Sequence, residues 1–250
     1  MSLKLSGKYA VVTGAGKGIG RAIAQRFLED DVAGVALLDM DLTLAQATAK
    51  ELDPTGTRAI AIGCNVADAE NVKNAFALVT EAFGRVDILV NNAGITRDAM
   101  FHKMSIEQAQ AVMNVHFYGT FYCCQAVIEG MRERNYGKIV NISSTSAFGN
   151  IGQTNYSAAK AAIDGFTRTL ALESARKNIT VNSIAPGMVD TDILKTIPAD
   201  IMEQKIKNTP AQRLGDPSEI ASVASFLASD DSSWVTGNCI LACGGLKMRG

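Results

Sequence analysis

The sequence predicts an α/β fold in which a doubly wound parallel sheet of about seven strands carries helices on both faces. Short apolar runs alternate with longer helical patterns along nearly the whole chain. Continuously apolar runs are typical of parallel strands that are covered on both faces. Regular strand–helix–strand alternation favours right-handed crossovers within one sheet. Hydrophobic residues make up 47% of the 250 residues, which is enough for a sizeable core.

The expected elements follow from these patterns in chain order. We expect strands at residues 9–13, 35–39, 59–63, 86–90, 138–143, 180–184 and 239–242. We expect helices at residues 19–28, 68–83, 106–134 and 156–175, among others. No repeat or linker interrupts the alternation, so residues 1–250 are interpreted as one domain. The polar segment 192–213 contains Pro198 and Pro210 and is predicted to be a mobile helical lid.

Composition excludes several classes of function. The net charge of −1 gives no general attraction to nucleic acid or to an anionic membrane. No apolar stretch is long enough to span a bilayer, and the first residues lack the long apolar stretch of a signal peptide. The five cysteines do not have a zinc spacing, and we expect no metal site. Free thiols are typical of a reducing compartment, so we expect a cytoplasmic protein.

A tyrosine and a lysine four residues apart form a candidate acid/base pair. Tyr156 and Lys160 lie in a predicted helix, where a spacing of four places two side chains on one face. A tyrosine hydroxyl has a pKa near 10, and a neighbouring ammonium group favours the phenolate. We therefore expect Lys160 to bring the pKa of Tyr156 toward the working range. The alternative is a solvated pair on the outer face of the helix.

A glycine-rich turn follows the first predicted strand and opens a helix. Residues 13–20 read Thr-Gly-Ala-Gly-Lys-Gly-Ile-Gly, a pattern that lets a diphosphate approach the helix N-terminus. Asp39 ends the second strand, where its carboxylate can accept hydrogen bonds from a ribose and would repel a 2′-phosphate. Lys17 has the opposite tendency, because its cation could neutralise that phosphate. The arrangement indicates a Rossmann-like fold that prefers NAD, with NADP left possible.

These residues and four further motifs closely resemble the short-chain dehydrogenase/reductase family over essentially the full chain. The motifs are residues 91–94 (Asn-Asn-Ala-Gly), Asn114, the serine pair Ser143-Ser144, and Pro186-Gly187 with Thr191 four residues beyond. The resemblance implies catalytic roles for Asn114, Ser144, Tyr156 and Lys160. It implies cofactor contacts from Gly14, Gly16, Lys17, Gly18, Ile19, Gly20, Asp39, Asn65, Val66, Asn92, Ala93, Gly94, Tyr156, Lys160, Pro186, Gly187, Val189 and Thr191.

The resemblance also implies how these residues would act. Tyr156 would give a proton to a carbonyl or take one from an alcohol, and Lys160 would also hold the nicotinamide ribose. A serine would orient the substrate oxygen, and Asn114 would anchor a water that continues the proton relay.

The chain departs from the family pattern at two positions. The usual spacing of thirteen residues before the tyrosine falls on Ser143, whereas the end of the fifth strand aligns Ser144. We favour Ser144, because strand register fixes the direction of a side chain while loops absorb deletions. Asn65 stands where the family commonly has an aspartate near the adenine, and its carbonyl can still accept a hydrogen bond there.

Within the family the chain is most similar to 3-oxoacyl-carrier-protein reductases and acetoacetyl-CoA reductases, through residues 94–104, 127–134, 152–156 and 244–248. This similarity implies reduction of a 3-oxoacyl thioester to the 3-hydroxyacyl thioester. The alternative is an NAD-dependent secondary-alcohol or 3-hydroxyacyl dehydrogenase, and a remote one is a nucleotide-binding regulator without turnover.

The resemblance further implies a homotetramer that packs through helices 106–134 and 156–175, with Ala158, Ala161, Ala162 and Ala171 suited to close contact. An acidic carrier protein could be a partner if Arg132, Arg134, Arg176 and Lys177 form a basic rim. The alternative for these four cations is a set of helix-end residues that complement the helix dipole.

Overall fold

Seven parallel strands form the central sheet of the computed structural model, which describes residues 4–191 and 199–247. The strands are β1 (Tyr9–Thr13), β2 (Gly34–Asp39), β3 (Ala59–Gly63), β4 (Ile88–Asn91), β5 (Gly137–Ile142), β6 (Ile179–Pro186) and β7 (Cys239–Ala242). Their order across the sheet is β3-β2-β1-β4-β5-β6-β7, and every pair is parallel. The predicted seven-stranded parallel sheet is therefore confirmed.

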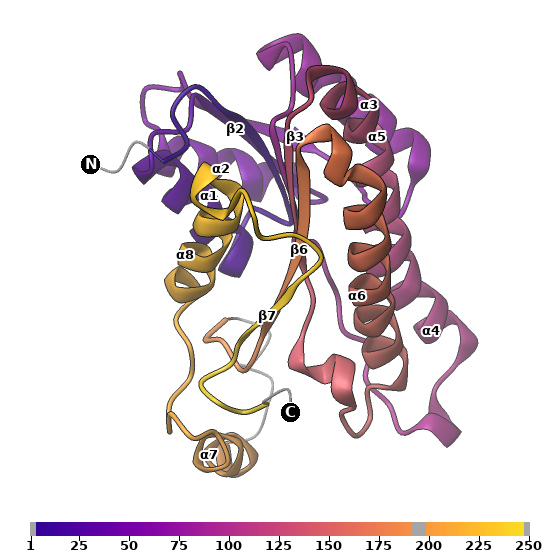
Figure 1. Cartoon of the computed structure of the whole chain (residues 1–250). Helices are drawn as coiled ribbons and strands as arrows, with labels where there is room; N and C mark the ends of the chain where they lie inside the picture. The colour runs from indigo at the N-terminus through magenta and orange to yellow at the C-terminus, as the bar shows by residue number, and fades with distance from the viewer. Residues whose placement is uncertain (1–3, 192–198, 248–250) are drawn as a thin grey trace.

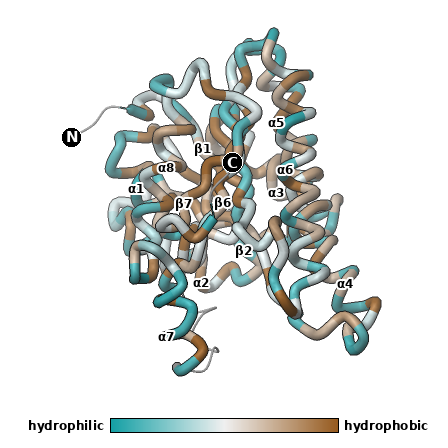
Figure 2. The backbone as a smooth tube through the Cα atoms, turned by 60° about the horizontal axis from the view of Figure 1, so that its bottom comes forward, coloured by the Kyte–Doolittle hydropathy of each residue, from teal (hydrophilic) through white to brown (hydrophobic). Residues whose placement is uncertain are grey.

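Helices cover both faces of this sheet (Figure 1). They are α1 (Gly18–Glu29), α2 (Leu42–Leu52), α3 (Ala69–Phe83), α4 (Ile106–Met113), α5 (Gly119–Arg134), α6 (Thr154–Ser174), α7 (Ala199–Lys207) and α8 (Pro217–Ala228). Residues of α1 and α8 share one apolar core with the strands, and residues of α3, α5 and α6 form the core on the other face. Apolar residues concentrate in the strands between these layers (Figure 2).

The expected helix over residues 106–134 is divided in the structure, and this prediction was wrong in detail. A π-helical turn, Asn114–Tyr118, separates α4 from α5, and the Gly119 amide donates to the Asn114 carbonyl oxygen. Such a turn inserts an extra residue and rotates the side chains that follow it. Hydrophobic periodicity cannot reveal a single inserted residue, because the apolar pattern continues through it.

The strand order reverses direction between β1 and β4. The chain leaves β1 toward β2 and β3, then returns to build β4 to β7 on the other side of β1. Ligands of open α/β sheets bind at such a point, outside the carboxyl ends of the strands. The helix α7 lies beyond this end of the sheet (Figure 1).

The predicted lid at 192–213 falls partly outside the described residues. Residues 192–198 are not described, whereas residues 199–207 form α7. Among the described residues no helix is long and apolar enough to cross a membrane.

Candidate active site

Side-chain hydrogen bonds join the ends of β1 and β4 at the point of reversal. The Thr13 hydroxyl accepts from the backbone amides of Asn92 (3.0 Å) and Ala93 (3.1 Å). The Asn92 side-chain amide donates to the carbonyl oxygens of Thr13 (2.9 Å) and Gly14 (3.0 Å). Two polar side chains thus hold the glycine-rich turn against the loop after β4, and both loops face the same space.

The glycine-rich turn is shaped so that only glycine fits at its two ends. Gly14 has a φ of +62°, and a Cβ there would lie 2.9 Å from the Cα of Ala93. A Cβ on Gly20 would overlap the carbonyl oxygen of Gly14. Lys17 is the N-cap residue of α1, and its side chain makes no capping hydrogen bond to the helix. The helix N-terminus and the glycine turn fit a diphosphate, which is bound by backbone N–H groups at a helix N-terminus.

Asp39 closes the other side of the turn. Its carboxylate accepts from the Gly16 amide at 2.9 Å and from the Asp41 amide at 3.1 Å. The side chain thereby fixes the end of β2 beside the glycine turn, at the position where a carboxylate can meet a ribose.

A cavity of about 210 Å³ lies between this turn and α6. Its walls include ten of the residues expected to contact a cofactor: Gly14, Lys17, Gly18, Ile19, Asn92, Ala93, Gly94, Tyr156, Lys160 and Thr191. The other lining residues are Ile95, Thr96, His116 and Ile142. The sequence motifs therefore meet around one space.

Lys160 is buried at the base of this cavity. Only 3% of the residue is exposed, and its Nζ donates to the carbonyl oxygen of Ile142 at 2.6 Å. Burial lowers the pKa of Lys160 from 10.5 to about 7, although the Asp164 carboxylate opposes the change. The lysine therefore carries only part of a positive charge at neutral pH.

Tyr156 lies beside Lys160 on the same face of α6, as the spacing predicted, but its pKa moves the other way. The Lys160 Nζ is 5.5 Å from the centre of the Tyr156 ring. Burial and the Asp98 charge raise the pKa of Tyr156 to about 12, and a hydrogen bond from Ser144 is the influence that lowers it. The expectation that Lys160 lowers this pKa is not met, because the ammonium points at Ile142 and is itself partly neutral.

The two neighbouring serines have different surroundings. The Ser144 hydroxyl contacts Tyr156 and accepts from the Ser146 amide at 3.0 Å. Ser143 is buried at 2% exposure, and its hydroxyl lies 3.4 Å from the backbone oxygen of Lys160. Ser144 is thus the serine whose hydroxyl shares the site of Tyr156.

A second cavity, of about 360 Å³, opens on the other side of Tyr156. Ser144, Tyr156 and Thr96 line it, and Gly187 and the neighbouring Met188 close one wall. Tyr156 and Thr96 line both cavities. The phenol therefore stands between the space beside the glycine turn and a separate space large enough for a small organic group.

Asn114 does not reach this site. Its side chain is exposed, and it belongs to neither cavity wall. His116, two residues further along the π-helical turn, points inward instead. Its ring meets Tyr156 edge to face with centroids 5.0 Å apart. Positions two apart on a helix point to nearly opposite sides, so the expectation for Asn114 is corrected in favour of His116.

His116 is neutral at physiological pH and holds the loop after β4. Burial and the nearby Lys160 lower its pKa to about 3. Its Nε2 lies 3.1 Å from the Ile95 amide nitrogen and 2.8 Å from the Ile95 carbonyl oxygen, so either neutral tautomer bonds this backbone. Its Nδ1 is buried and has no protein partner among the described residues. No motif pointed to His116; its being one of two histidines in the chain was the only signal.

The remaining predicted contacts lie around these two cavities without lining the first. Gly16 and Gly20 form the inner side of the turn, and Pro186 ends β6. Val66 is buried against Gly119, and Val189 is buried beside Gly215. Asn65 is exposed, and its side-chain oxygen accepts from the Ala67 amide at 3.1 Å. This oxygen is therefore already engaged within its own loop.

Comparison with known proteins identifies the family. A family model described as enoyl-(acyl carrier protein) reductase matches residues 14–247. The 3-oxoacyl-[acyl-carrier-protein] reductase FabG of Vibrio harveyi is 39% identical over 249 residues, covering 98% of this chain and all of that protein. The chain belongs to the short-chain dehydrogenase/reductase family.

Other members of this family are similar over the same length. The acetoacetyl-CoA reductase of Cupriavidus necator is 42% identical over 242 residues, which cover 96% of this chain and 98% of that protein. The (2S)-[(R)-hydroxy(phenyl)methyl]succinyl-CoA dehydrogenase subunit BbsD of Thauera aromatica is 39% identical over 244 residues, which cover 98% of each. The relatives thus include both reductases and a dehydrogenase.

The lowered pKa of Lys160 predicts how the stability of the folded protein changes with pH. An unfolded lysine keeps its proton up to a pH near 10.5, whereas the folded one releases it at about 7. Between these values folding releases a proton, so this group makes stability rise with pH, and below pH 7 it adds no pH dependence. We expect the melting temperature of the parent to rise relative to that of Lys160→Met from pH 7 to pH 9. Parallel melting curves over this range would contradict the low pKa.

The contact between His116 and Ile95 predicts a loss of stability when the histidine is replaced. His116→Phe keeps an aromatic ring against Tyr156 but leaves the Ile95 backbone without its partner, which costs about 1–3 kcal/mol. His102→Phe, at an exposed position, is the matched control and should stay within about 0.5 kcal/mol of the parent. Urea unfolding measures both. Equal stabilities for the two variants would show that the His116–Ile95 contact contributes little.

Proposed function

We propose that this protein is an oxidoreductase that uses a nicotinamide cofactor to reduce a 3-oxoacyl thioester to the 3-hydroxyacyl thioester. The observation that carries the proposal is the position of Tyr156 in the walls of both cavities, with Ser144 against its hydroxyl. One cavity adjoins the glycine turn and the other takes the substrate. The names of the Vibrio and Cupriavidus relatives support this substrate class.

The residues divide the chemistry between them. A nicotinamide cofactor bound beside the glycine turn would supply the hydride. Tyr156 gives its phenolic proton to the substrate oxygen, and Ser144 holds that oxygen by a hydrogen bond. The Ser146 amide fixes the Ser144 hydroxyl, so the donor is positioned before the substrate arrives. Lys160 would hold the ribose hydroxyls of that cofactor and return a proton to Tyr156, a role for which its pKa of about 7 is well matched.

The pKa of Tyr156 favours the reductive direction at neutral pH. With a pKa of about 12 the phenol is protonated and can act as an acid. Oxidation of an alcohol needs the phenolate and should therefore accelerate as pH rises. An NAD-dependent dehydrogenase of a secondary alcohol or 3-hydroxyacyl thioester remains the alternative, and it is favoured by the carboxylate of Asp39 and by the name of the Thauera relative.

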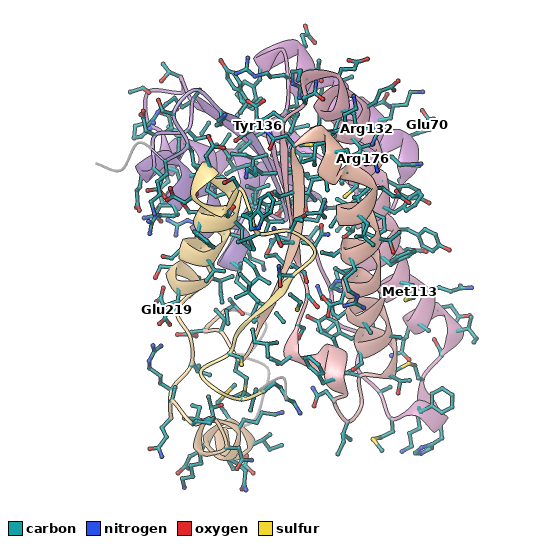
Figure 3. All side chains as sticks on the ribbon, viewed as in Figure 1. Glu70, Met113, Arg132, Tyr136, Arg176 and Glu219 are labelled. Atoms are coloured by element: carbon teal, nitrogen blue, oxygen red, sulfur yellow. The ribbon has the colours of Figure 1, made fainter. Side chains whose placement is uncertain are left out.

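Further proposals concern the partners and the location of the protein. We infer a homotetramer in a reducing cytoplasm. The free cysteines support the reducing compartment, and the exposed surface of α6 supports the assembly. Ala158 and Ala161 are exposed there and Leu172 is 82% exposed, whereas Ala171 is buried in the chain's own core. For a carrier protein the support is weaker. Arg132 donates to the Glu173 carbonyl oxygen, and Arg132 and Arg176 lie at the end of the molecule opposite α7 (Figure 3).

Tyr156→Phe tests the proposed function. The substitution removes the proton donor and keeps the ring, so we expect kcat with acetoacetyl-CoA to fall by about 10²–10⁴-fold. Binding of the nicotinamide nucleotide, measured by fluorescence titration, should stay close to that of the parent. A parent protein that reduces neither acetoacetyl-CoA nor acetoacetyl-N-acetylcysteamine would refute the function.

The serine pair provides a matched comparison in the same assay. Ser144→Ala removes a hydrogen bond to the reacting oxygen and should lower kcat by about 10²-fold or more. Ser143→Ala removes an equal group at a position that faces the Lys160 backbone, and we expect a much smaller loss. A larger loss for Ser143→Ala would reverse the assignment of the two serines.

The carboxylate of Asp39 leads to a prediction about the preference between NADH and NADPH. We propose that its carboxylate selects NADH by repelling the 2′-phosphate of NADPH. Asp39→Asn removes the charge and retains an oxygen that can accept from Gly16, so the turn should keep its shape. We expect kcat/KM for NADPH relative to NADH to rise about tenfold or more in the variant. A parent that already uses NADPH as efficiently as NADH would contradict this proposal.

A further inference from the structure

Two lysines line the proposed substrate cavity. Lys205 of α7 and Lys247 of the segment after β7 both lie in the lining of the 360 Å³ cavity, with Ser144 and Tyr156. Among the described residues that line this cavity, none is an aspartate or a glutamate. The chain as a whole has a net charge of −1, so this local excess of cations is not a general property of the surface.

The nearby carboxylates are engaged elsewhere. Asp98 accepts from the Gln153 side chain at 2.8 Å and is not among the residues that line the cavity. On α7 itself Glu203 pairs with Lys207, whose Nζ lies 2.8 Å from the carboxylate. Neither Lys205 nor Lys247 takes part in an ion pair with another described residue. The two ammonium groups are therefore available to a ligand.

The rest of the wall is also polar. The side-chain amides of Asn150, Gln153 and Asn208 and the hydroxyls of Thr145 and Ser146 line the same space. Among the described lining residues, Met188 and Leu246 are the long apolar ones. The polar part of the wall is well suited to a small group that accepts hydrogen bonds.

We propose that Lys205 and Lys247 form an anion subsite that binds a carboxylate or phosphate carried by the substrate. Ammonium groups bind these anions through charge-assisted hydrogen bonds, and the neighbouring amides can supply further donors. The subsite rests on the proposed reduction of a 3-oxoacyl thioester and narrows the substrates to those that carry an anionic group. That group is either an acyl-end carboxylate or a phosphate of the thioester carrier.

Three thioesters separate these two sources. Acetoacetyl-N-acetylcysteamine has no anion, acetoacetyl-CoA has phosphates on the carrier, and 3-oxoadipyl-N-acetylcysteamine has a carboxylate on the acyl chain. Each is assayed with the parent, Lys205→Gln, Lys247→Gln and the double variant. Lys207→Gln is the matched control, because it lies two residues from Lys205 on α7, pairs with Glu203 and is outside the cavity wall.

We expect the double variant to raise KM for one anionic substrate about tenfold or more relative to KM for the neutral one. An effect on acetoacetyl-CoA alone identifies the phosphate, and an effect on the 3-oxoadipyl thioester alone identifies the carboxylate. In the parent, added salt should weaken the binding of the same anionic substrate more than that of the neutral one. The proposal is overturned if the ratio of KM values is unchanged, or if Lys207→Gln changes it equally.

Failure of the subsite and failure of the proposed function give different results. A parent that reduces none of the three thioesters refutes the function. Calorimetric titration with adipate and with 4′-phosphopantetheine still decides the subsite in that case. Binding of either compound by the parent and its loss in the double variant support the subsite, and absence of binding by the parent overturns it.

Discussion

The hydrogen bonds of Thr13 and Asn92 across the reversal of the sheet are the contacts on which the rest of the site depends. Strands β1 and β4 are neighbours in space, yet about eighty residues separate them in sequence. The Thr13 hydroxyl and the Asn92 amide connect their carboxyl ends through four short hydrogen bonds. They hold the glycine turn and the loop after β4 at one fixed separation, and the cavity beside Tyr156 lies between those loops. A buried polar network of this kind specifies one geometry because a broken member would leave unpaired groups.

The electrostatics of the site follow from its burial. The same exclusion of water lowers the pKa of Lys160, lowers that of His116 and raises that of Tyr156. At pH 7 the imidazole of His116 and the phenol of Tyr156 are therefore neutral, and Lys160 carries only part of its positive charge. A neutral phenol is a proton donor, and a lysine with a pKa of about 7 can exchange protons with it readily. The asymmetry suits reduction of a carbonyl, because the acid is ready before the reaction begins.

The division between the two cavities explains why sequence motifs describe one half of the site better than the other. The 210 Å³ cavity lies against backbone features, the glycine turn and the N-terminus of α1, whose positions follow from strand–turn–helix order. Such features leave a spacing signature in the chain. The 360 Å³ cavity is lined by side chains of α7, the turn after β5 and the segment after β7, which come together only in three dimensions. Lys205, Lys247, Asn150 and Met188 have no signature in sequence for this reason.

The sequence by itself determined the parallel α/β sheet, the order of its strands and helices, the glycine turn and the pairing of Tyr156 with Lys160 on one helical face. These features depend on local periodicity and spacing, which the chain carries directly. Strand register in the sequence also favoured Ser144 over Ser143, and Ser144 is the serine that meets the Tyr156 hydroxyl in the structure. Only the tertiary structure decided that His116 and not Asn114 faces Tyr156. It also decided that Lys160 is too buried to act as a full positive charge. These two outcomes depend on which side of one helical turn faces inward and on the exclusion of water, and neither can be read from the spacing of residues.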